Sequence, residues 1–306
     1  MACSHAAYVD AYRKLGSLAD AAQLAHDKDC PLSFEALASI LSQKLDSEVR
    51  RTDGQHRGHA RKYVERFLGG ESLLAIAASV GVPPTKLARY VLEEHLGKSR
   101  GKEVGQLLKK PRLIADERLR REVAACVDED PHMGPHSDTV KRLIGLEYEE
   151  LLAQKLRLLG VPFLSEEQLR KRGDAKTPDA LLPVPLLVRG RVVNWIDSKA
   201  TFGSPETHQE LSSQFAGYLH RFDAGLVLYW FGFDESIDTD ARVLCLDDLR
   251  PSECALLACM PAPPALARGA SDAGERAGGA HKAQRWGSGG APEEVGPSGT
   301  SRWGDD

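Results

Sequence analysis

The sequence predicts an α/β fold in which a helical N-terminal region with a helix-turn-helix unit precedes a mixed sheet flanked by helices. Through the first 120 residues Leu and Ala recur with the 3.6-residue period of helices, and β-branched alternation is almost missing. Farther along the chain the hydrophobic period changes to two, which is typical of strands. We therefore expect a helical region over residues 1–120, an α/β domain over 121–264 and a tail over 265–306.

The composition is that of a soluble globular protein, with 42% hydrophobic and 27% charged residues among 306. No apolar run approaches the ~20 residues needed to span a bilayer, so we expect no membrane partner. Six cysteines without paired spacing indicate reduced thiols inside the cell.

The charge distribution bears on nucleic-acid binding. A net charge of −4 argues against a protein that coats nucleic acid without specificity. Two segments, residues 50–62 and 98–121, are nevertheless rich in lysine and arginine. Such clusters can neutralise phosphates, although a run of charge is more often a solvated helix face.

Residues 71–96 have the pattern of a helix-turn-helix pair. Gly81 supplies a tight turn, and Pro84 suits the first turn of the second helix. The second helix would present three polar side chains outward, as a helix that reads a DNA groove does: Thr85, Lys86 and Arg89. The alternative is an ordinary helical hairpin that binds only protein.

The second half of the chain predicts alternating helices and strands. Helices are expected at 137–159 and 208–222, and strands at 161–164, 180–188, 191–196, 225–233 and, more weakly, 241–246. Arg189 and Gly190 form a plausible hairpin turn between the two long strands. After about residue 264 Gly, Ser, Ala and Pro dominate without periodicity, so the tail is predicted to be disordered.

Two aspartates and a lysine lie at the ends of predicted buried strands. Side chains alternate along a strand, so Asp197 and Lys199 should point to the same side. Asp179 opens the preceding strand, and pairing of the two strands would bring its carboxylate near Asp197. Clustered carboxylates repel unless a cation lies between them, and hard oxygen ligands suit Mg²⁺ or Mn²⁺. A neighbouring lysine can orient a water or stabilise charge on a phosphate.

Two helices offer further site residues. Glu149 shares a helical face with Leu152 and Leu156, so we expect it to point toward the core, where a carboxylate needs a partner or a metal. Gln214 and Tyr218, four apart on one face of another helix, are placed to contact the lysine or a substrate phosphate.

The order Pro178-Asp179 and then Asp197-Ser198-Lys199 resembles the active-site motif of the PD-(D/E)xK nuclease superfamily, and Gln214 with Tyr218 resembles the QxxxY motif of its RecB-like branch. The runs FLSEEQLRKRGDAKTPDALLPVPLLVRGRVVNWIDSKATFG and SSQFAGYLHRFDAGLVLYWFGF are similar to the codanin-interacting nuclease family of metazoa. The resemblance is strongest over residues 145–233 and looser in the N-terminal half.

The resemblance implies helix-turn-helix units followed by a Holliday-junction-resolvase-like nuclease domain with a restriction-endonuclease-like sheet. It also implies a protein of nucleus and cytoplasm that binds codanin, a partner of histone-chaperone pathways, with a link to erythroid differentiation.

The favoured hypothesis is a metal-dependent DNA endonuclease, with branched DNA as a candidate substrate. Asp179, Asp197, Glu149 and the backbone carbonyl of Ser198 would hold Mg²⁺ or Mn²⁺, and Lys199 would position the attacking water. Two alternatives stay open. The nuclease fold can serve as a catalytically weak interaction platform for codanin, or the N-terminal helices can bind DNA through Lys86 and Arg89.

Overall fold

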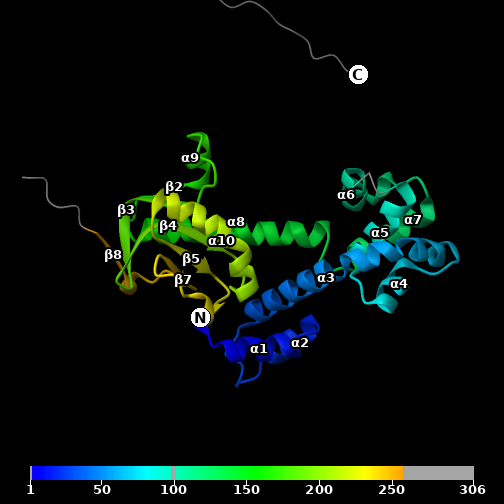
Figure 1. The fold of residues 1–306 in the computed structure, drawn as a ribbon, viewed down its shortest axis with the longest axis horizontal. Helices are drawn as coiled ribbons and strands as arrows, with labels where there is room; N and C mark the ends of the chain where they lie inside the picture. The colour runs from blue at the N-terminus through cyan, green and yellow to red at the C-terminus, as the bar shows by residue number, and fades with distance from the viewer. Residues whose placement is uncertain (1, 98–100, 258–306) are drawn as a thin grey trace, which may run out of the picture. The chain divides into compact units, whose positions relative to one another are not determined.

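The computed structural model describes residues 2–97 and 101–257, which form a mixed α/β protein (Figure 1). The helices before the main sheet are α1 (His5–Lys14), α2 (Leu18–Ala25), α3 (Phe34–Leu68), α4 (Leu73–Val80), α5 (Pro84–Leu96), α6 (Gly101–Lys109), α7 (Glu117–Asp128) and α8 (Pro135–Leu158). Within the sheet region lie α9 (Glu166–Lys171) and α10 (Pro205–Phe222). The predicted mixed α/β class is confirmed, whereas the helix-turn-helix, restriction-endonuclease-like and domain-boundary assignments stay predictions. The predicted disordered tail lies outside the described residues.

The main sheet has the strand order β2-β3-β4-β5-β7, with β8 paired to β3. Its strands are β2 (Leu164–Ser165), β3 (Ala180–Val188), β4 (Arg191–Lys199), β5 (Gly225–Tyr229), β7 (Val243–Leu246) and β8 (Cys254–Leu256). β3 and β4 are antiparallel, whereas β4, β5 and β7 are parallel to one another. The sheet is therefore mixed, as the sequence predicts.

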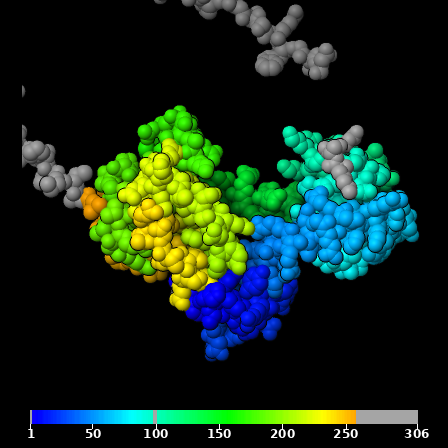
Figure 2. Space-filling model, in the orientation of Figure 1, coloured from blue at the N-terminus to red at the C-terminus, as the bar shows by residue number. Residues whose placement is uncertain are grey.

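The two faces of the sheet carry different cores. Leu152 and Leu156 of α8 pack in one buried cluster with Ile196 and Leu228. Phe215 and Tyr218 of α10 pack on the opposite face, in a cluster that includes Trp195. Figure 2, in the orientation of Figure 1, shows the side chains of α10 covering this second face. Because side chains alternate along β4, Trp195 and Asp197 both face α10.

The central hairpin forms where the sequence predicts it. Arg189 and Gly190 both have positive φ, 49° and 77°, as a two-residue hairpin turn of the type I′ class requires. The register shifts between Leu181 and Leu186, where Pro183 and Pro185 have no N–H to donate to the ladder.

Other element bounds differ from the predictions for local reasons. α10 begins at Pro205 rather than near His208, because the Ser204 side chain caps it by accepting from the Thr207 N–H at 3.2 Å. The predicted strand 225–233 ends at Tyr229, and the chain turns through Gly232, whose φ is 88°. The prediction of a strand at 161–164 is wrong except at its last residue.

α9 was not predicted. It begins with a reciprocal capping box, in which the Ser165 hydroxyl accepts the Gln168 N–H and the Gln168 side chain accepts the Ser165 N–H. That Ser-x-x-Gln spacing is a start signal that the sequence does contain.

The N-terminal segment is tied to the region after β5. β1 (Ala2–Cys3) pairs in parallel with β6 (Phe233–Asp234). Tyr8 of α1 stacks on Phe202, with ring centroids 5.8 Å apart. Among residues 2–97 and 101–257, no helix is long and apolar enough to cross a membrane.

Two helices, α4 and α5, form in the segment for which a helix-turn-helix unit was predicted, and Gly81 between them has a left-handed φ of 67°. The prediction that Thr85 points outward is wrong. Thr85 is 4% exposed, its N–H donates to the Asp130 carboxylate at 3.0 Å, and its hydroxyl donates to the Cys126 carbonyl at 3.2 Å. The loop after α7 therefore occupies that part of the face that was expected to read DNA.

Candidate active site

Strand β4 delivers Asp197 and Lys199 to the same side of the sheet. Asp197 is 1% exposed, and the Lys199 Nζ lies 2.6 Å from its Oδ2. Burial lowers the pKa of Lys199, whereas the carboxylates of Asp197 and Asp179 raise it. The carboxylates together have the larger effect, so the pKa of Lys199 is raised. Lys199 is therefore a cation at neutral pH.

Asp179 is fixed to the same strand through the backbone. Its Oδ2 accepts the N–H of Ser198 at 2.6 Å, which holds the carboxylate beside that of Asp197. Burial, together with the charge of Asp197, raises the pKa of Asp179 to about 8, although Lys199 opposes the shift. Burial also raises the pKa of Asp197. The hairpin thus brings the two predicted carboxylates and the lysine together.

Tyr218 and Gln214 reach the cluster from α10. The Tyr218 hydroxyl donates to the Thr177 carbonyl at 2.9 Å and lies 3.4 Å from the Asp197 Oδ1. The Gln214 amide in turn donates to the Tyr218 hydroxyl at 2.6 Å. Both side chains therefore face the site.

The prediction for Glu149 is wrong in its direction. Its side chain is exposed on α8 rather than turned into the core, although Leu152 and Leu156 on the same helix are buried. Partial desolvation and the charge of Glu166 raise the pKa of Glu149, with Lys199 acting against them. In the described part of the chain, no three His, Cys, Asp or Glu side chains are grouped closely enough to hold a metal ion.

The oxygen atoms present nevertheless fit a magnesium ion. Asp197 Oδ2 is buried, and among the described residues it is compensated by the Lys199 ammonium at 2.6 Å and by no further hydrogen-bond donor. Mg²⁺ commonly takes one or two carboxylates and keeps several waters. The carboxylates of Asp179 and Asp197 and the backbone carbonyl of Ser198 are ligands of that kind.

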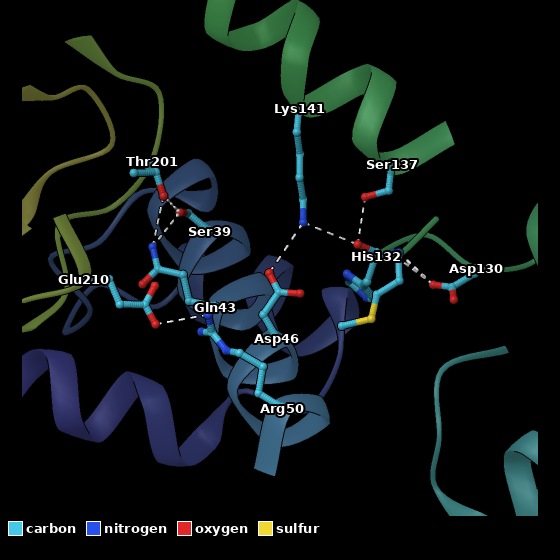
Figure 3. Close-up of polar contacts among 11 residues, drawn as sticks. Ser39, Gln43, Asp46, Arg50, Asp130, His132, Ser137, Lys141, Thr201 and Glu210 are labelled. Atoms are coloured by element: carbon cyan, nitrogen blue, oxygen red, sulfur yellow. Dashed lines mark hydrogen bonds and ion pairs between the residues drawn. The ribbon is translucent and has the colours of Figure 1, made fainter. Parts of the chain in front are cut away.

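Helix α3 supports the segment that follows Lys199 (Figure 3). The Gln43 amide donates to the Phe202 carbonyl at 2.8 Å and to the Thr201 hydroxyl at 2.9 Å. The Phe202 N–H donates to the Ser39 hydroxyl at 2.9 Å. These residues were missed from the sequence, because no local spacing relates side chains about 160 positions apart.

The predicted nucleic-acid residues lie apart from this site. Lys86 and Arg89 are half-buried on α5, and no contact in residues 2–97 and 101–257 joins them to the acid–lysine cluster. The arginines of α3 are largely neutralised: Arg57 pairs with Asp53 and Glu93, and Arg61 pairs with Glu65. The basic segment over 50–62 therefore carries less free positive charge than its composition indicates.

Two hollows border the site region. A cavity of about 340 Å³ is lined by residues that include Thr177, Gln214 and Tyr218, and the Tyr218 hydroxyl lies 3.4 Å from the Asp197 Oδ1. A larger hollow of about 910 Å³ lies among α3, α8 and the loop before α8 and reaches Thr201. Asp179, Asp197 and Lys199 are among the lining residues of neither hollow. The smaller cavity lies nearer to the acid–lysine cluster, because Tyr218 both lines it and contacts Asp197.

Fold and site define a mixed α/β protein whose buried acid–acid–lysine cluster lies on neighbouring strands of one hairpin. The chain belongs to the CDAN1-interacting nuclease family. It is 39% identical over 245 residues to "CDAN1-interacting nuclease 1" of Xenopus laevis, covering 74% of this chain and 81% of the relative. The Homo sapiens protein of the same name is 37% identical over 221 residues, covering 67% and 79%.

A family model also matches part of the chain. Residues 115–249 match the family described as "Protein of unknown function TPD sequence-motif", and within that span Thr177, Pro178 and Asp179 spell TPD. The Danio rerio CDAN1-interacting nuclease 1 is 36% identical over 246 residues, covering 75% of this chain and 82% of the relative. No solved structure matches the chain. The family resemblance drawn from the sequence is confirmed.

Proposed function

We propose that this protein is a metal-dependent nuclease that hydrolyses phosphodiester bonds in DNA. The observation that carries the proposal is the pair of a half-buried Asp179 and a buried Asp197 at the paired strands, with the Lys199 ammonium 2.6 Å from Asp197. The relatives' name contains the word nuclease, which agrees with this chemistry.

Asp179, Asp197 and the Ser198 carbonyl would hold one Mg²⁺ or Mn²⁺, and Glu149 would reach it through water. The bound ion would supply a Lewis acid and a water of lowered pKa. Lys199, which stays charged, would orient that water and stabilise the negative charge that develops on the phosphate.

The chain's other residues hold this arrangement in place. Tyr218 fixes the Thr177 carbonyl just before Asp179, and Gln214 orients the Tyr218 hydroxyl. The N–H of Ser198 locks the Asp179 carboxylate to β4. A preorganised site of this kind has little need to reorganise during the reaction.

The direct test is cleavage of labelled linear and branched DNA by the full chain in Mg²⁺, in Mn²⁺ and in EDTA. The nuclease proposal predicts products with either metal and none in EDTA. Cleavage in EDTA would contradict metal dependence. Preference for a four-way junction over a duplex of equal length would support action on branched DNA.

A second candidate function is an interaction platform. The relatives are named for interaction with CDAN1, and we propose that this chain also binds codanin. The hollow of about 910 Å³ and the exposed apolar Val140 and Leu143 on α8 offer surface that the catalytic residues do not use. If the chain captures codanin but cuts no DNA, this candidate replaces the first. Residence in nucleus and cytoplasm and a role in erythroid differentiation are part of the same proposal and rest on the family resemblance alone.

A further inference from the structure

The cavity beside the catalytic cluster has two walls. One is formed by Ser213, Gln214 and Tyr218 of α10, and the other by α9 and the loop that leads into β3. The loop contributes Asp174, Lys176 and Thr177. Tyr218 lines this cavity and its hydroxyl lies 3.4 Å from the Asp197 carboxylate, so the cavity is close enough to take a phosphate next to one bound at the cluster.

The charges that line the cavity are paired, with one exception. Glu166 forms an ion pair with Arg170 at 2.7 Å, and Asp174 forms one with Arg221 at 2.6 Å. The Lys176 ammonium has no ion pair or hydrogen bond to any residue in 2–97 or 101–257. The wall therefore presents one uncompensated positive charge, which suits an anion.

The backbone at Lys176 is held in an uncommon conformation. Its φ is 52°, in the left-handed region that residues with a Cβ rarely adopt. Two side chains of α10 hold the loop there: Arg221 donates to the carbonyls of Ala175 and Lys176, and Tyr218 donates to that of Thr177. A strained residue that the surroundings hold in place beside an active site is a candidate for function.

The side chain of Lys176 is directed over α10. A Cβ added at Gly217 would lie 3.6 Å from the Lys176 Cδ, so the lysine stem lies over the glycine, and Lys176 lines the same cavity as Gln214 and Tyr218. The helix that carries Tyr218 therefore also contacts the stem of Lys176.

We propose that Lys176 binds a non-bridging phosphate oxygen of the substrate strand, at a phosphate next to the one that is cleaved. The assignment rests on the proposed nuclease function, and it names a contact outside the acid–lysine and Gln214–Tyr218 residues. A lysine provides a compact point charge for phosphate without reading base sequence.

The test compares Lys176→Ala with Lys171→Ala in the full chain. Lys171 is an exposed lysine of α9 that pairs with Glu167 and does not line the cavity, so both variants lose one charge. Binding of a fluorescein-labelled duplex is followed by anisotropy in an Asp197→Asn background, where cleavage is stopped. We expect Lys176→Ala to weaken binding about three- to tenfold and to reduce the slope of log K against log salt by about 1, with Lys171→Ala unchanged.

A second variant separates charge from folding. Lys176→Gly also removes the ammonium but suits a φ of 52°, so it should melt no lower than the parent chain and still lose affinity. Lys176→Arg should restore binding. With Asp197 intact, KM should rise more than kcat falls.

The Lys176 contact and the nuclease function can fail separately in these experiments. If the parent cuts DNA while Lys176→Ala and Lys171→Ala share one affinity and one salt slope, the inference is wrong and the nuclease proposal stands. A parent chain that neither binds nor cuts DNA overturns both.

Discussion

The backbone N–H of Ser198 donates to the Asp179 carboxylate at 2.6 Å, so the first residue of the site is anchored between the other two, Asp197 and Lys199. One backbone hydrogen bond thus couples the start of β3 to the end of β4. A shift of one residue in the pairing of these strands would turn Asp197 to the opposite face of the sheet.

Replacing Asp197 by Asn should lower cleavage by orders of magnitude, because it removes the charge of a metal ligand and keeps its shape. DNA binding should persist or tighten, since a carboxylate that repels phosphate is gone. Gel assays and anisotropy would measure the two effects. Asp10→Asn, on an exposed face of α1, is the charge-matched control. Undiminished cutting by Asp197→Asn in Mg²⁺ would contradict the catalytic assignment.

Replacing Lys199 by Ala should also abolish cleavage, but metal binding should stay largely intact because lysine is not a ligand. Its ammonium lies 2.6 Å from the Asp197 carboxylate and lowers the pKa of both aspartates. Without it a cation meets less repulsion but must displace more tightly held protons, and these two effects oppose each other. Calorimetric titration with Mn²⁺ would measure the affinity. Loss of metal affinity along with activity would show that Lys199 is needed to build the site. Codanin capture should be unchanged in this variant and in Asp197→Asn.

Metal affinity should depend on pH through Asp179. Its pKa of about 8 lies well above the usual 3.8, so the carboxyl is largely protonated at pH 6 and must lose its proton to bind a cation. The Mg²⁺ dissociation constant should fall by up to about tenfold per pH unit from pH 6 to 8 and level off above that. Asp179→Asn should bind weakly without that slope. A pH-independent affinity in the parent chain would show that another group sets it.

The same shift predicts how the metal-free protein responds to pH. Because the folded-state pKa of Asp179 is raised, its contribution to stability is fully present below about pH 4 and is lost as the pH rises through 8. Thermal melts in EDTA should therefore show a fall in Tm between pH 5 and 8 that is smaller in Asp179→Asn. An identical fall in both proteins would assign the effect to other groups.

Replacing Gln43 by Ala should destabilise the protein by about 1 to 2 kcal/mol, because the carbonyl of Phe202 and the hydroxyl of Thr201 lose a donor. The end of β4 should also loosen, so cleavage should fall several-fold. Urea unfolding and steady-state kinetics would measure the two effects. Gln55→Ala, at an exposed position of the same helix, is the matched control and should change neither.

The sequence by itself determined the hairpin and its polar residues. Alternation over two apolar runs and the Arg189-Gly190 turn are local signals, and they fix which residues share a face of β4. The convergence of Asp179, Asp197 and Lys199 follows from that pairing, and the i, i+4 spacing of Gln214 and Tyr218 placed both on one helix face. The roles of these residues in catalysis stay predictions.

Only the tertiary structure decided the orientations and partners of side chains that depend on contacts distant in the sequence. Helical periodicity assigned Glu149 to a buried face, but α8 covers the sheet with Leu152 and Leu156 and leaves the carboxylate exposed. Thr85 turned inward because the loop after α7 supplies Asp130 to its N–H, a contact 45 residues away. The hydrogen bonds from Gln43 and the unpaired charge of Lys176 also depend on contacts between segments that are distant in the sequence. The periodicity of residues along a chain does not predict such tertiary contacts.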